Sequence, residues 1–265
     1  MSLRDAPLLY VFVDVHGLPR ERELLETVVG FPVIEIEPHL PHHRHGAVKY
    51  DAGRLIFSVN LSSPGKFRAD RSDALVTVFD VDPARRLGER LRDYGRVEAR
   101  PEGELFTDAS GHHYLFRPAP GTSAGPAAAE LRLTVDDLAA SARFYADVLD
   151  LEPRERSAKR ARFATGTIDL VLEESDSAAD GRLPDRRTCL IVFYTAEMDK
   201  ARNALEARGL DFGNKRGAFS EIGGTARFDD PSGHRFCLYE PSAESLTWES
   251  GPKVKQLAAS GDAAL

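Results

Sequence analysis

The chain has 265 residues, of which 42% are hydrophobic, and this is enough sequence for two packed domains. Its net charge of −7 and its pI near 5.7 argue against nucleic acid as the main partner, because phosphate binding needs a basic surface. No stretch has the length of a membrane span or the pattern of a signal peptide, so we expect no membrane partner and a cytoplasmic protein with free thiols at Cys189 and Cys237.

The first half of the sequence predicts the order β-α-β-β-β twice. Apolar residues at 7–15 indicate a buried strand, and the apolar spacing along residues 20–29 indicates a helix that ends at Gly30. Asp82 is predicted to cap a second helix, with Pro83 at its first position. Extended segments are predicted near residues 33–36, 47–50, 54–60, 73–79, 97–99, 105–106 and 113–117.

A stretch rich in proline, glycine and alanine separates the two halves at residues 119–129 and has the composition of a linker. The second half repeats the plan: Asp136 or Asp137 is predicted to cap a helix that runs to Leu149, and a further helix is predicted at 197–208. We therefore predict a first unit at 1–118, the linker at 119–129, a second unit at 130–242 and a loosely ordered tail at 243–265, from which Trp248 could dock.

One turn sequence occurs in both halves. Residues 106–112 read Phe-Thr-Asp-Ala-Ser-Gly-His, and residues 228–234 read Phe-Asp-Asp-Pro-Ser-Gly-His. Such a recurrence indicates tandem units, and the Asp, Pro and Gly positions are typical of a tight turn. In the strand after the second turn, alternation places Arg235, Cys237 and Tyr239 on one face.

These patterns resemble the vicinal oxygen chelate superfamily, which includes glyoxalase I, bleomycin-resistance proteins and extradiol dioxygenases. The resemblance rests on Leu-x-Leu-x-Val-Asp-Asp-Leu-x-x-Ser-x-x-Phe-Tyr at 131–145, Gly-x-Ile-Asp-Leu at 166–170 and Asp-Pro-Ser-Gly-His-Arg-Phe at 230–236, with looser matches at 24–31, 80–82 and 106–112. It implies an α+β fold, in which tandem βαβββ modules form two cup-shaped, partly closed β-sheets with helices outside. It does not fix the reaction, because members include metal enzymes and metal-free drug binders.

The resemblance also implies four metal-ligand positions in each unit, on its first, fourth, fifth and eighth strands. Relatives place histidines and glutamates there, whereas this sequence has Glu130, Asp169, Leu190 and Cys237 in the second unit and Tyr10, Ile56, Asp73 and Leu115 in the first. Leucine cannot bind a metal, so we expect no cofactor. Glu130 and Asp169 remain candidate ligands for a divalent metal, although we interpret them as partners of Arg132 or Arg235.

Alternation along the strands predicts the lining of the second cup. It comprises Glu130, Arg132, Thr134, Asp169, Val171, Val192, Tyr194, Arg235, Cys237 and Tyr239. The mixture of charged, aromatic and aliphatic side chains favours a small organic ligand, partly aromatic or hydrophobic. We therefore predict a protein that binds or sequesters such a molecule, as a monomer or a homodimer.

Two other functions stay open. The chain could be an enzyme, either a dioxygenase or lyase with unusual metal ligands or a metal-free isomerase or hydrolase that uses Glu130, Asp169 and Arg235, with His113 as a candidate general acid or base. It could also be an interaction module whose cups are filled by its own side chains. Cys237 is a poor nucleophile, because no histidine is evident beside it.

Seven of the eight histidines gather in two places. A loop contains His39, His42, His43 and His45, and we interpret it as solvated, with a lid or a metal site as alternatives. At the turn exits, His112, His113 and His234 are expected to satisfy hydrogen bonds of the turns or the strand ends.

Overall fold

A computed structural model describes residues 3–4, 6–37, 46–61, 75–119, 125–174, 189–213 and 218–262. Its internal contacts divide the chain into two compact units. Unit 1 comprises residues 1–10, 133–183 and 190–265, and unit 2 comprises residues 11–132 and 184–189. None of the helices in the described part is long and apolar enough to cross a membrane.

The helices and strands follow the predicted order along the chain. The first two modules contain β1 (Leu8–Val15), α1 (Leu18–Arg22), η1 (Glu23–Val29), β2 (Val33–Glu37), β3 (Ala47–Asp51), β4 (Ile56–Leu61), β5 (Leu75–Val81), η3 (Pro83–Arg85), α2 (Leu87–Leu91), β6 (Arg96–Arg100), β7 (Gly103–Thr107) and β8 (His113–Pro118). The last two modules and the tail contain β9 (Ala127–Val135), α3 (Leu138–Arg143), η4 (Phe144–Val148), β10 (Glu152–Arg156), β11 (Arg160–Ala164), β12 (Asp169–Glu174), β13 (Cys189–Tyr194), α4 (Met198–Ala207), β14 (Ala218–Ser220), β15 (Gly223–Asp229), β16 (Arg235–Pro241), η8 (Ser245–Thr247) and α5 (Gly251–Asp262).

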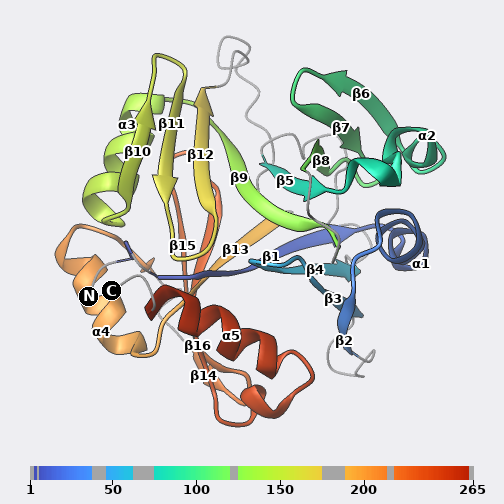
Figure 1. Cartoon of the computed structure of the whole chain (residues 1–265). Coiled ribbons are helices and arrows are strands. Elements are labelled where there is room, and N and C mark those ends of the chain that lie inside the picture. The colour runs from blue at the N-terminus through green and yellow to red at the C-terminus, as the bar shows by residue number, and fades with distance from the viewer. Residues whose placement is uncertain are drawn as a thin grey trace. The chain divides into compact units, whose positions relative to one another are not determined.

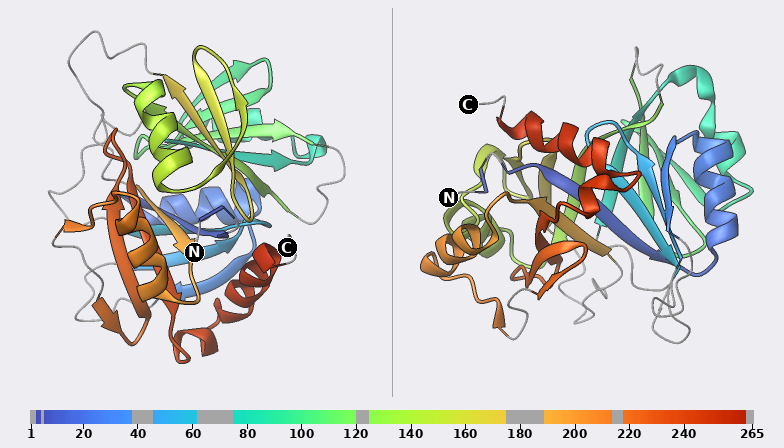
Figure 2. Two further views of the ribbon diagram at one scale, coloured as in Figure 1. Left: turned by 90° about the vertical axis from the view of Figure 1, so that its left-hand side faces the viewer. Right: turned by 90° about the horizontal axis from the view of Figure 1, so that it is seen from below.

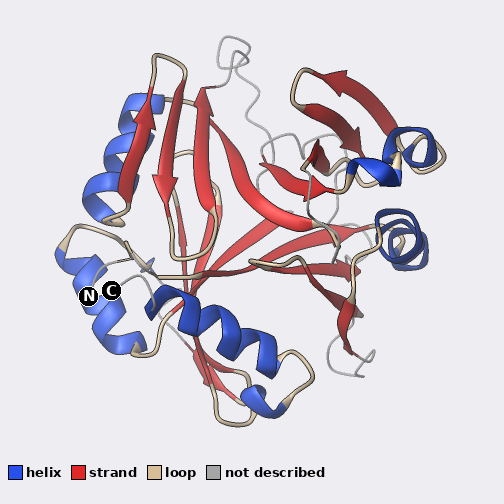
Figure 3. Cartoon of the chain, in the orientation of Figure 1, coloured by secondary structure: helices blue, strands red, loops and turns tan. Residues whose placement is uncertain are grey.

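The described strands form two mixed sheets (Figures 1 and 3). Their strand orders are β14-β15-β16-β13-β1-β4-β3-β2 and β10-β11-β12-β9-β5-β8-β7-β6. Most neighbouring strands are antiparallel, but β5 with β8 and β13 with β16 are parallel. The α+β class with tandem βαβββ modules is confirmed, and the chain pairs its first module with its fourth and its second with its third.

Helix ends follow the local signals in the sequence. The side chain of Asp82 accepts a hydrogen bond from the amide of Ala84, and that of Asp137 accepts one from the amide of Ala140. Both are therefore N-caps, as predicted, although Asp82 begins a short 3₁₀ turn rather than a long helix. Gly30 ends η1 with a positive φ of 83°, a conformation that glycine adopts without strain.

Aromatic side chains fill the core of each unit. In unit 2, the Phe79 ring lies 4.9 Å from Phe31 and 5.6 Å from Phe57, measured between centroids. In unit 1, the rings of Phe228 and Phe236 stack at 5.3 Å, and α3 covers the hairpin of β10 and β11 and the neighbouring β12 (Figures 1 and 2).

The repeated turn is built in the same way in both units. A buried aspartate accepts two backbone hydrogen bonds from the turn that follows it: Asp108 from Ser110 and His112, and Asp230 from Ser232 and His234. A phenol hydroxyl also donates to each carboxylate. It comes from Tyr114 in unit 2 and from Tyr145 in unit 1. The Asp-x-Ser-Gly-His signature thus has a structural function in each unit.

The tail departs from the prediction of a loosely ordered segment. Residues 251–262 form helix α5, and two of its apolar side chains, Val254 and Leu257, are buried. The tail is also in contact with its own unit, because the hydroxyl oxygens of Tyr239 and Ser245 lie 3.2 Å apart. The prediction was wrong because α5 has only a short run of apolar residues at helical spacing. The burial of these residues depends on tertiary contacts that the local sequence does not show.

Gly223 provides a test of the packing between β15 and β16. Its φ is +123°, and an added Cβ would lie 2.1 Å from the carbonyl oxygen of Glu240 and 2.7 Å from the amide nitrogen of Ser242. We expect Gly223→Ala to lower the free energy of unfolding by about 2 kcal/mol or more, because the clash is with backbone and the φ is strained. Denaturant titration measures this difference. Gly17→Ala is the matched control, since nothing lies within 4 Å of its Cβ position, and an equal loss in both variants would contradict the argument.

Candidate functional site

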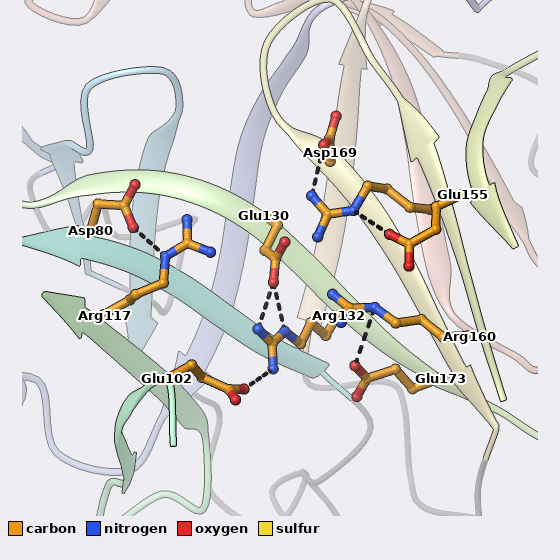
Figure 4. A network of polar contacts seen from close by, with 10 residues as sticks. Asp80, Glu102, Arg117, Glu130, Arg132, Glu155, Arg160, Asp169 and Glu173 are labelled. Atoms are coloured by element: carbon orange, nitrogen blue, oxygen red, sulfur yellow. Dashed lines mark hydrogen bonds and ion pairs between the residues drawn. The ribbon is translucent and has the colours of Figure 1, made fainter. Parts of the chain in front are cut away.

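A buried ion pair in unit 2 includes Glu130, the first of the ligand positions that the resemblance implies. Glu130 lies on β9 with its side chain 2% exposed, and the Nη2 of Arg132 lies 2.7 Å from its Oε1. The Nε of Arg132 donates to the same oxygen at 2.7 Å. Because the two residues are two positions apart in one strand, they share a face of the sheet, as alternation predicts (Figure 4).

Arg132 contacts a second carboxylate at its outer end. Its Nη1 lies 2.6 Å from Oε1 of Glu102, which sits in the turn between β6 and β7 with its side chain 42% exposed. One guanidinium therefore bridges a buried carboxylate and a solvent-exposed one (Figure 4). The forked donors of arginine suit this bridging geometry.

A second ion pair of unit 2 joins the parallel strands β5 and β8. Asp80 and Arg117 are cross-strand partners, and the Nε of Arg117 donates to Oδ1 of Asp80 at 2.7 Å. This hydrogen bond raises the pKa of Arg117, and the charge of Glu130 acts in the same direction. The side chain of Arg117 is 35% exposed and that of Asp80 is 26% exposed, so solvent reaches both.

Together these residues form the Arg117–Arg132 face, which we define as Asp80, Glu102, Arg117, Glu130 and Arg132. It carries two guanidinium groups and three carboxylates, and the more exposed carboxylates lie at its edge. A ligand with an anionic group could take the place of Glu102 on Arg132, since both would offer oxygen acceptors to the same donors. Sequence reasoning missed Asp80, Glu102 and Arg117. Alternation along β5 and β8 could have shown on which face of the sheet the side chains of Asp80 and Arg117 lie.

The carboxylate of Asp169 in unit 1 has different partners from those expected. The Nη1 of Arg162, on the adjacent strand β11, lies 3.0 Å from Oδ2 of Asp169, and the Nη1 of Arg154 lies 3.3 Å from its Oδ1. The expected pairing of Asp169 with Arg132 or Arg235 is therefore wrong. Arg160 and Glu173 form a further cross-strand pair between the same two strands, farther along β12 (Figure 4).

The lining predicted for a single cup is divided between the two sheets. Glu130, Arg132, Thr134, Asp169 and Val171 belong to the sheet that contains β9 and β12. Val192, Tyr194, Arg235, Cys237 and Tyr239 belong to the sheet that contains β13 and β16. The expectation assumed that modules adjacent in sequence share a sheet, and the third and fourth modules do not.

The second group has its own internal contacts within unit 1. Tyr239 donates to the carbonyl oxygen of Ile222 at 2.8 Å, and its ring packs edge-on against Tyr10. Cys237 is 3% exposed, its Sγ donates to the carbonyl oxygen of Leu238, and burial raises the pKa of its thiol to about 11. A thiol in this environment stays protonated and is a poor nucleophile, as the sequence indicated.

The donor groups that the structure describes are poorly arranged for a metal ion. Within the described ranges no group of three or more histidine, cysteine or acidic side chains could hold an ion. Leu115 and Leu190 are apolar, and the carboxylates of Glu130 and Asp169 are each bonded to arginine. A metal at either carboxylate would have to displace a charged partner, which costs free energy.

Only three of the histidines singled out in the sequence, His112, His113 and His234, lie within the described residues. His39, His42, His43, His45 and the family position Asp73 lie outside the described residues. The rings of His112 and His234 bind the backbone carbonyl oxygens of Asp14 and Thr134, which confirms their expected structural function. His113, the candidate acid or base, has its Nδ1 3.0 Å from the hydroxyl of Thr107 on the paired strand.

The fold and the turn signature define the class of this protein. Residues 127–238 match the family model described as Glyoxalase/Bleomycin resistance protein/Dioxygenase superfamily. This stretch of the chain thus matches the superfamily that its motifs resemble. No curated protein matches the chain.

Solved structures extend the likeness to nearly the whole chain. Glyoxalase I from Zea mays is similar with a TM-score of 0.69 and 15% sequence identity, covering 96% of each chain. A putative dioxygenase from Bacillus subtilis is similar with a TM-score of 0.68 and 11% identity, covering 98% of this chain and 96% of that chain. At these identities the likeness shows the fold, in which both halves of the chain take part.

Proposed function

We propose that this protein binds a small organic molecule with an anionic group and an aromatic or hydrophobic body, and that it does so without the metal site of its superfamily. The observation that supports this most is the Glu102–Arg132–Glu130 arrangement. The buried carboxylate of Glu130 stays bonded to the guanidinium of Arg132. The carboxylate of Glu102 is exposed enough for an anionic group of a ligand to replace it. The superfamily description names bleomycin resistance proteins beside enzymes, so a binding function lies within its range.

Ligand exchange at Arg132 explains why a buried ion pair would be useful at this site. Glu130 fixes the guanidinium in one orientation, and a positioned donor loses less conformational entropy on binding than a mobile one. Arg117 adds a second guanidinium on the same face, held by Asp80 at 2.7 Å. Charge-assisted bonds from two fixed arginines suit a carboxylate, sulfonate or phosphate group of a ligand.

Dye binding tests the proposal with a probe of this chemistry. We expect 8-anilinonaphthalene-1-sulfonate, an anionic aromatic dye, to bind with enhanced fluorescence and about fivefold more tightly to Glu102→Gln, because the competing carboxylate is gone. Arg117→Met should weaken binding about tenfold. Glu98→Gln is the matched control, since it removes a nearby acidic residue that pairs with Arg96 and Arg100 instead. Dye binding that is equal in all four proteins would contradict the proposal.

Divalent metals separate this function from the alternative of a metal-dependent enzyme. We expect the melting temperature of untagged protein to be unchanged by Mg²⁺, Mn²⁺, Ni²⁺ or Zn²⁺ and by chelator, because the carboxylates of Glu130 and Asp169 are bonded to arginine. A stoichiometric metal whose stabilising effect disappears in Glu130→Gln would instead support a dioxygenase- or lyase-like enzyme with unusual ligands.

A further inference from the structure

A cysteine and a histidine that are distant in sequence meet in unit 2. The Sγ of Cys189, at the start of β13, lies 3.9 Å from Nδ1 of His112 in the repeated turn. Cys189 is partly exposed as a residue, whereas His112 is 2% exposed. The pair thus joins a partly exposed cysteine to a buried histidine.

A hydrogen bond to the backbone determines which nitrogen of His112 can accept a proton from the thiol. The Nε2 atom lies 2.6 Å from the carbonyl oxygen of Asp14, and a carbonyl can only accept, so Nε2 carries a hydrogen. In the neutral ring Nδ1 is then the acceptor, and it points at the thiol. Nucleophile, base and an orienting third group thus stand in the order that activates a cysteine.

Acidic groups surround this pair on the other side. Asp108 accepts hydrogen bonds from the amides of Ser110 and His112 and from the hydroxyl of Tyr114. Burial opposes a charged imidazole, but the hydrogen bond and charge of Cys189 and the charge of Asp108 outweigh it and raise the pKa of His112 to about 10. An imidazolium at His112 and a thiolate at Cys189 therefore stabilise each other, and the charge of Asp108 adds to the effect.

Glu21 from α1 is the second buried carboxyl at this place. It is 5% exposed, and its Oε1 has no hydrogen-bond partner among the residues that the structure describes. Burial and the neighbouring charge of Asp108 raise the pKa of Glu21 to about 8, while His112 and Arg20 act in the opposite direction. In unit 1 the corresponding position of the repeat holds Ser141, whose hydroxyl lies 3.4 Å from that of Ser232. Of the two repeated turns, only the one that contains His112 thus has a buried carboxyl, that of Glu21, at this position.

We propose that Cys189 is a nucleophilic thiol that small hydroperoxides oxidise, with His112 as the base that holds it as a thiolate. The thiolate attacks one oxygen of the hydroperoxide, so that an S–O bond forms and the O–O bond breaks. Cysteine is oxidised to sulfenic acid and the hydroperoxide is reduced. The leaving oxygen takes the proton of the His112 imidazolium and departs as water or an alcohol, which returns His112 to its neutral form.

The chain's second cysteine is an internal control for the test. In untagged full-length protein, dimedone should trap a sulfenic acid on Cys189 after treatment with hydrogen peroxide, and peptide mass spectrometry should find none on Cys237. Iodoacetamide should modify Cys189 at least about tenfold faster than Cys237 at neutral pH. The rate at Cys189 should also change little between about pH 6 and 8, whereas an ordinary thiol gains about tenfold per pH unit there.

Variants separate the action of His112 from simple exposure of the thiol. His112→Asn should lower the alkylation rate of Cys189 about tenfold and restore the ordinary pH dependence. Cys237→Ser should leave the rate at Cys189 unchanged. Since His112→Asn removes a buried bond to Asp14 and could unfold the turn, the pH profile of the wild-type chain decides by itself. A rate that rises tenfold per pH unit in that chain, or no dimedone adduct on Cys189, overturns the proposal.

Discussion

Replacing Arg132 by methionine is expected to lower the free energy of unfolding by about 3 to 5 kcal/mol. The variant keeps the carboxylate of Glu130, whose side chain is 2% exposed, but removes the guanidinium that lies 2.7 Å from it. A buried charge that loses its partner costs far more than the pair contributed, because the charge cannot be hydrated where it lies. Equilibrium denaturation in urea measures the loss.

Two further variants show whether the missing partner is the cause. In Glu130→Leu combined with Arg132→Met no buried charge is left, so the double variant should lie within about 1 kcal/mol of the wild-type chain. Arg96→Met removes an arginine that is 69% exposed and pairs with Glu98, and it should cost less than about 0.5 kcal/mol. If the double variant were as unstable as Arg132→Met, lost packing of the arginine stem would be the explanation instead.

Local chemistry made much of the fold predictable from the sequence. Asp82 and Asp137 cap their helices because a short acceptor at that position binds the first free amides, whatever surrounds it. Likewise, the pairing of Glu130 with Arg132 follows from the alternation of one strand. Such features depend on a few neighbouring residues, and the sequence contains all of them.

Pairings between distant segments were not predictable. Asp169 binds Arg162 because of the register in which β11 and β12 pair. The residues expected to line one cup lie in two different sheets, because the third and fourth modules do not share a sheet. The contact of Cys189 with His112 joins residues 77 positions apart and has no local pattern at all. Sequence reasoning therefore expected an arginine partner for both carboxylates, but the partner that it named is found only for Glu130.

The pH dependence of stability should carry the signature of one buried carboxyl, Glu21. Its pKa is about 8 in the folded chain against an ordinary value of 4.5, chiefly because burial disfavours the charged form. The folded state therefore keeps a proton that the unfolded chain loses, and the stabilisation is complete below about pH 4.5 and is lost as the pH rises to about 8. His112, with its raised pKa of about 10, acts in the same direction at higher pH.

Replacing Glu21 by glutamine isolates the contribution of this residue to the pH dependence of the free energy of unfolding. The amide can donate to Asp108 as the protonated acid does, but it cannot ionise. We expect Glu21→Gln to be as stable as the wild-type chain near about pH 5 and more stable by about 3 kcal/mol near about pH 8.5, measured by urea denaturation across that range. Glu23→Gln, on the exposed side of the same helical segment, should follow the wild-type curve. Parallel curves for Glu21→Gln and the wild-type chain would mean that Glu21 is ionised in the folded state, and the neutral carboxyl placed beside His112 and Cys189 would then be wrong.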